Sequence, residues 1–134
     1  MIDIENQVFN RISLAVRAVY PNANMSSEEQ LTPSSFPCVS LVEADNRVVK
    51  ETEDSSLDEN HAFVMYEVNV YANNVNSKKA ECKKIFSIVD DELRKMGFRR
   101  MSALNTSFNN STIDRKTGRY EGVVGKNEII YGGY

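Results

Sequence analysis

Few residues in this 134-residue chain have types and spacings suited to catalysis or metal binding. The one histidine, His61, stands at the start of an alternating stretch, so a nucleophile–histidine–acid triad or a multi-histidine metal site would depend on a single residue. The two cysteines, Cys38 and Cys82, are far apart in the sequence and cannot alone form a structural zinc site. We therefore expect no catalytic residues, no metal and no cofactor, and predict that the chain is not an enzyme.

Three short motifs have simpler explanations. Gly122–Lys126 lacks the spacing of a phosphate loop and falls in an expected hairpin, where no helix follows to hold an anion. Lys116–Gly118 matches one element of the penicilloyl-serine enzymes, but no S-x-x-K supplies their nucleophile. Asp90–Glu92 are successive helical residues, which point about 100° apart and cannot converge on one ion. We expect them to form a solvated face.

Charge is distributed unevenly along the chain. Residues 43–59 hold seven acids and two bases, whereas residues 78–100 hold eight bases and four acids. If the two patches lie on different flanks, the acidic flank of one copy suits the basic flank of the next, and such head-to-tail contacts close into rings or continue as filaments. In the alternative, the patches neutralise each other within one copy or face water.

The elements that must position these residues are organised around His61–Phe98. Residues 61–72 alternate in polarity, which predicts a strand with its even positions facing a helix. The odd face, with Phe63 and Met65, is too apolar near its start for a solvated surface, so we expect a second partner to cover part of it. Residues 78–96 predict a one-sided helix with Ser77 as N-cap. Gly97 should end it in a Schellman arrangement, with Phe98 returning to Leu93.

The rest of the chain predicts one more helix and several strands. A helix from about Ile4 to Tyr20 begins after a capping Asp3. Polar, proline-containing residues 22–37 and acidic residues 51–60 are expected to be mobile surface loops, the first with a helical turn at residues 26–30. Further strands are expected at residues 38–45, 47–53, 98–104, 118–124 and 128–131, with the first two forming a hairpin turned at Asp45-Asn46.

These elements indicate an α+β single domain over residues 1–134, with a mainly antiparallel sheet of about four to six strands and both long helices on one face. A net charge of −3 argues against a phosphate-neutralising nucleic-acid binder. Both cysteines are expected to be reduced, as in a cytosolic compartment. We expect neither a signal peptide nor a membrane-spanning segment, because no apolar run is long enough.

One family resemblance adds to this interpretation. The order of Val70–Asn74, Lys78–Ala80, Ile88–Asp90, Leu93 and Met96–Arg100, followed by Thr112–Arg115 and Arg119–Gly122, resembles the tail terminator (tail completion, head-tail joining) family of long-tailed bacteriophages. The resemblance covers about half of the chain, from Ala62 to Val124. Ser77 stands where the family pattern has a glycine, and Asp114 stands where an aromatic residue commonly precedes the arginine.

The resemblance implies a virion structural protein, present in the bacterial host cytoplasm during assembly. It implies a hexameric ring that stops tail-tube growth and joins the tail to the head connector or head-closure protein, with DNA passing through but no sequence-specific binding. The residues expected at subunit or partner contacts are Phe63, Met65, Glu51, Glu53, Asp54, Asp58, Glu59, Lys78, Lys79, Arg99 and Arg100. Two alternatives are another neck or tail protein, such as a head-closure or tube subunit, and a small ligand-binding module or enzyme.

Overall fold

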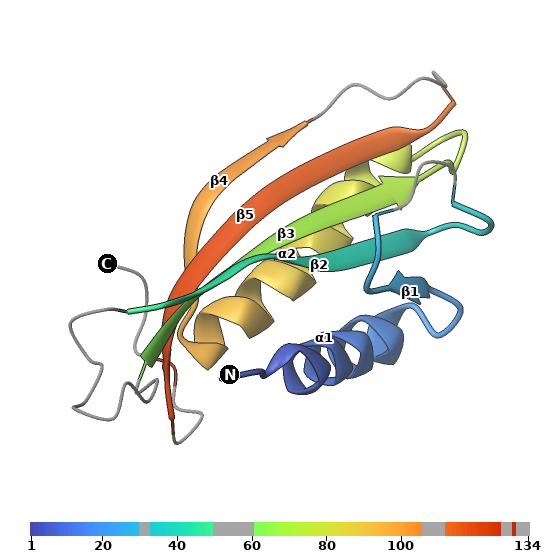
Figure 1. The fold of residues 1–134 in the computed structure, drawn as a ribbon. Helices are drawn as coiled ribbons and strands as arrows, with labels where there is room; N and C mark the ends of the chain where they lie inside the picture. Colours follow the sequence, from blue (N-terminus) through green and yellow to red (C-terminus); the bar gives the residue numbers. More distant parts are fainter. Residues whose placement is uncertain (30–32, 50–60, 106–111, 127–129, 131–134) are drawn as a thin grey trace, which may run out of the picture.

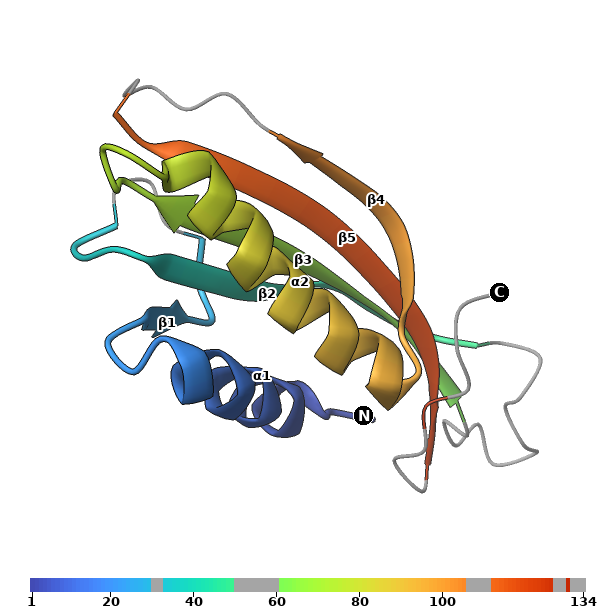
Figure 2. The same cartoon turned by 180° about the vertical axis from the view of Figure 1, so that it is seen from behind.

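The computed structural model describes residues 1–29, 33–49, 61–105, 112–126 and 130. In chain order, this part of the protein forms α1 (Glu5–Val19), β1 (Asn24–Ser26), β2 (Cys38–Val48), β3 (His61–Ala72), α2 (Lys78–Met96), β4 (Arg99–Asn105) and β5 (Asp114–Gly125). Both helices lie against the same face of one curved sheet, and neither covers the opposite face (Figures 1 and 2). We call that opposite face the open face.

The strands are ordered β1-β2-β3-β5-β4. The pairs β2·β3, β3·β5 and β4·β5 are antiparallel, whereas β1 and β2 are parallel. The α+β class, the single domain and the placement of both helices on one face are therefore confirmed, but the sheet is mixed. Ser40, which pairs with Asn69 of β3, donates a hydrogen bond from its Oγ to the carbonyl of Glu28 (2.8 Å), so Glu28 lies on the open face just after β1.

The predicted strand and helix of the central unit have the bounds of β3 and α2. The even residues of β3 pack in the core with the apolar stripe of α2. Gly97 adopts a positive φ of 107°, and the N–H groups of Gly97 and Phe98 donate to the carbonyls of Arg94 and Leu93, each at 3.0 Å. This is the expected Schellman ending. The N-cap prediction is wrong in detail, because the hydroxyl of Ser77 makes no capping hydrogen bond.

The first helix begins one residue later than predicted, and Asp3 Oδ1 accepts the N–H of Glu5 (3.1 Å) at its start. No helix in the described part of the chain has the length and hydrophobicity needed to cross a membrane.

The predicted hairpin at Asp45-Asn46 is wrong, because β2 continues through both residues and pairs with β3 on each side. The pairing between β2 and β3 shifts register between Glu43 and Asp45, and β2 continues beyond this shift. The Asn46 amide, whose residue type suggested a turn, donates instead to the Ile2 carbonyl (2.8 Å) and holds the N-terminal segment against the strand.

Residues 22–37 are not simply a loop, because they contain β1. Ser26–Glu29 form no helical turn; Ser26 Oγ instead bonds to the backbone of Glu28. Near the C-terminus, β5 starts four residues before the predicted strand. Only an isolated bridge between Val124 and Ile130 represents the expected last hairpin, since residues 127–129 and 131 lie outside the described part. The expected loop at 51–60 lies outside it as well.

Candidate assembly surfaces

The open face presents the odd side chains of β3 together with their register partners on β2 and β5. Asn69 lies at its centre and is 2% exposed. Its Oδ1 accepts hydrogen bonds from Arg115 Nε (3.0 Å) and Thr117 Oγ1 (2.7 Å), and its Nδ2 donates to Glu67 Oε1 (3.3 Å). An ion pair between Glu67 and Arg119 (3.5 Å) continues this row of contacts. The middle of the open face is thus a connected polar lattice.

The apolar residues of this face are partly covered by the chain itself. Phe63 is 8% exposed, and the guanidinium of Arg47 lies 4.3 Å from its ring centre. Tyr71 is buried next to Arg115, whose guanidinium lies 5.6 Å from the ring centre. Met65 stays half-buried. Of the two predicted contact residues on β3, Met65 therefore remains partly accessible, whereas Phe63 is buried beneath Arg47.

The predicted basic residues divide into two groups at opposite ends of α2. Lys78 and Lys79 begin the helix, whereas Arg99 and Arg100 follow its end on β4. A helix rises about 1.5 Å per residue, so the two groups lie on the order of 25 Å apart. The other bases counted in this patch, Lys83, Lys84, Arg94 and Lys95, are exposed on α2 between the two groups. Lys79, Arg99 and Arg100 are exposed and Lys78 is half-buried.

The predicted acidic contact residues cannot be placed. Glu51, Glu53, Asp54, Asp58 and Glu59 all lie outside the described residues. The described part does hold a different acidic group, formed by Asp3, Glu5 and Glu43, whose carboxylate oxygens lie within 4.8 Å of one another. Burial raises the pKa of Glu43, and the neighbouring Glu5 and Asp3 raise it further. We interpret this group as a contact between like charges.

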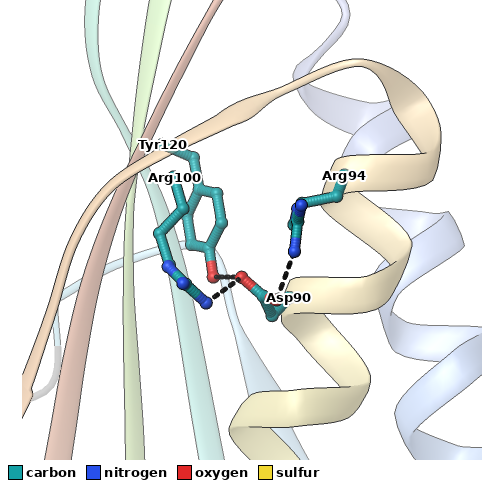
Figure 3. A network of polar contacts seen from close by, with 4 residues as sticks. All are labelled: Asp90, Arg94, Arg100 and Tyr120. Carbon is teal, nitrogen blue, oxygen red and sulfur yellow. Dashed lines mark hydrogen bonds and ion pairs between the residues drawn. The ribbon is translucent and has the colours of Figure 1, made fainter.

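A buried carboxylate in α2 was missed by the sequence analysis. Asp90 is 7% exposed, so the expectation of a solvated face is wrong for this residue. Its Oδ1 accepts hydrogen bonds from Tyr120 Oη (2.6 Å) and Arg100 Nη1 (3.2 Å), and Arg94 lies 3.9 Å from Oδ2 (Figure 3). The signal was its position four residues after Phe86 and three before Leu93, which places it beside the apolar stripe. This network ties β4 and β5 to α2, and it engages Arg100 within the chain.

Both thiols are free and buried. Burial raises the pKa of Cys38 to about 11 and that of Cys82 to about 12. Because the thiolate is the reactive form, neither residue is an effective nucleophile near neutral pH.

The two edges of the sheet differ in length and exposure. β4 has six exposed residues out of seven, including Met101 (46%) and Leu104 (52%). β1, at the other edge, has three half-buried residues. Figure 1 shows the two strands at opposite edges of the sheet. An exposed edge strand offers backbone groups to a further strand.

Comparison with known proteins does not assign the chain to a family. No family model matches it, and no match was found among curated proteins. The resemblance to phage tail terminators stays a prediction.

Proposed function

We propose that this chain is a structural subunit that assembles into a ring at the head-proximal end of a phage tail tube. The ring would stop polymerisation of the tube and join it to the head connector. The proposal combines the family resemblance of Ala62–Val124 with the surfaces of the folded chain. In this view the protein acts by shape and contact, without chemical turnover.

The observation that carries the proposal is the one-sided layering of the sheet. An antiparallel sheet with helices on one face commonly leaves the other face to water or to a partner. Here the open face holds a fixed array of charged and polar side chains around Asn69, together with the half-buried Met65. Such a surface suits a wet, polar contact, as at interfaces that form on assembly.

Imaging and light scattering of the purified full chain test the proposal. We expect closed rings of uniform diameter, either alone or on addition of the tail-tube protein, and tubes of limited length when the chain is present during tube polymerisation. A chain that stays monomeric under both conditions and leaves tube length unchanged would contradict the proposal.

The same experiment separates the alternatives. A tube subunit would polymerise alone into filaments of unlimited length, and a head-closure protein would bind a connector without limiting tube growth. A ligand-binding module would show a compact monomer whose melting temperature rises with a small molecule, because ligands that bind only the folded state stabilise it.

A further inference from the structure

We propose that adjacent copies of this chain join edge to edge, with β4 of one copy adding antiparallel to β1 of the next, so that the sheet continues from subunit to subunit. This inference rests on the proposed ring function and names the contact that would close the ring. The partner is a second copy of the same chain.

The first support is the direction of the strands. β1 and β2 are parallel, and the pairs β2·β3, β3·β5 and β5·β4 are antiparallel, so β4 runs opposite to β1. When a second copy is placed beside the first without being turned over, its β1 therefore lies antiparallel to β4. This keeps all helices on one side and uses the more stable type of strand pairing. A contact between two different edges is also of the head-to-tail kind that can close into a ring.

The second support is the orientation of the backbone at β1. The N–H of Asn24 donates to the Pro37 carbonyl (2.9 Å), towards β2. Because successive residues of a strand direct their backbone groups to alternate sides, the N–H and C=O of Met25 point away from β2. They face the position that a neighbouring strand would occupy.

The register between β4 and the neighbouring β1 is limited by the face of the sheet on which each side chain lies. Asn24 and Ser26 pair with Cys38 and Ser40 on the open face of β2. Leu104 pairs with Thr117, which lies on the same face. A register with Asn24 opposite Leu104 places Ser26 opposite Ser102 and Met25 opposite Ala103, so every pair shares a face.

The third support is charge. In this register the C-terminal end of β1, followed by the exposed Glu28 and Glu29, approaches the end of β4 that carries Arg99 and Arg100. Arg100 is already bonded to Asp90, which leaves the exposed Arg99 as the main cation of the contact. β4 contains no acidic residue. A two-fold pairing of β4 with another β4 would supply no carboxylate from that strand, and it would leave the β1 edge unused.

Disulfide cross-linking of full-length variants tests the contact. Asn24→Cys and Leu104→Cys are made in separate copies, mixed, and oxidised gently. We expect a cross-linked dimer from the mixture and none from either variant alone. The native thiols should not compete, since both are buried. Ser87→Cys on the exposed face of α2 is the matched control, and it should cross-link with neither partner.

Charge reversal gives a second measurement. Adding Arg99→Glu to the Leu104→Cys copy should lower the yield about 1.4- to fivefold, because opposed like charges across strands cost about 0.2–1 kcal/mol. Adding Glu28→Lys and Glu29→Lys to the Asn24→Cys copy should restore it. Circular dichroism confirms that each variant is folded.

The outcomes separate the contact from the ring. Rings with no cross-link above the Ser87→Cys control would overturn the edge contact and leave the ring function standing. Cross-linking without rings would support the contact and overturn the ring function. Efficient cross-linking of Ser102→Cys alone would indicate a two-fold β4 contact and overturn the proposal. Neither rings nor cross-links would overturn both.

Discussion

At the residue scale, Asp90 shows how a charged side chain becomes part of a core. The carboxylate is nearly buried, yet it accepts a short hydrogen bond from Tyr120 and a charged one from Arg100. A buried carboxylate is tolerated when such partners replace its water. Helical spacing places Asp90 beside the apolar stripe, but its partner Tyr120 comes thirty residues later in the chain and only the fold brings them together.

Removing this acceptor should destabilise the fold. Asp90→Ala would leave the buried hydroxyl of Tyr120 without its partner, and we expect a loss of about 1–3 kcal/mol in the free energy of unfolding, measured by urea denaturation. Asp90→Asn keeps an acceptor oxygen and should cost less. The double variant Asp90→Ala, Tyr120→Phe should lose less free energy of unfolding than the sum of the losses in the two single variants. Strict additivity would show that the hydrogen bond contributes nothing.

Glu43 predicts a dependence of stability on pH. Its pKa in the folded chain lies above the ordinary value of 4.5, mainly because of burial and then because of Glu5 and Asp3. The folded state therefore holds this proton more tightly than the unfolded chain does. Stability associated with the protonated form is lost as pH rises through this window, since the group must then ionise among like charges.

Glu43→Gln should remove that loss. We expect the free energy of unfolding of the variant, relative to the natural chain, to increase as pH rises from about 4 to about 7, because glutamine does not ionise. Glu5→Gln, which removes one of the neighbouring charges, should reduce the same pH dependence without abolishing it. Parallel pH profiles for the Glu43→Gln variant and the natural chain would refute this account.

At the element scale, β3 and α2 were predictable to the residue, and the two ends of the sheet were not. In β3 and α2 the hydrophobic period, the capping glycine and the burial agree. β1 has only three residues and pairs in parallel with the next strand, β2, so its local sequence carried no signal. At Asp45-Asn46 a turn signal was overridden because pairing along β3 and the bond from Asn46 to Ile2 favour a continuous strand.

The packing of α2 on β5 depends on glycine. A side-chain carbon at Gly118 would meet the ring of Phe86, and one at Gly122 would lie 2.9 Å from Cδ1 of Phe98. Gly118→Ala should therefore lower the free energy of unfolding by about 1–3 kcal/mol through overpacking.

The control for this clash replaces the ring of Phe86 with the smaller side chain of leucine. In the Phe86→Leu background, Gly118→Ala should cost clearly less than in the natural chain, because the two residues are in contact and their effects couple. Chemical denaturation of the four proteins of this cycle measures the coupling. An equal cost in both backgrounds would show that the ring of Phe86 is not the obstacle.

At the scale of the whole molecule, the candidate site was only partly predictable. The exposure of Arg99 and the accessibility of Met65 agree with the sequence analysis, whereas Phe63 is covered by Arg47. A count of charges along the chain does not show that Lys79 and Arg99 lie a helix length apart, with other exposed bases of α2 between them. Which faces of the sheet stay open depends on how the helices pack on it, and the sequence alone did not show this packing.

Assembly through charged edges predicts sensitivity to salt. The Debye length falls from about 10 Å at 0.1 M to about 3 Å at 1 M ionic strength, so attraction between Arg99 and the glutamates after β1 should weaken. We expect the fraction of chains in rings, measured by light scattering at fixed protein concentration, to fall as sodium chloride is raised over this range. The Arg99→Glu variant should form fewer rings at low salt and respond less to added salt. A ring fraction that rises with salt would point to an apolar contact instead.

The one-sided layering has a consequence for a ring in which the sheets stand around the rotation axis and join edge to edge as a barrel. Every copy would present its helices in the same direction, so the inner and outer walls would differ in chemistry: one would be built from helix surfaces, the other from the guanidinium, carboxylate and amide groups around Asn69. Whatever passes through the lumen would meet only one of these two walls.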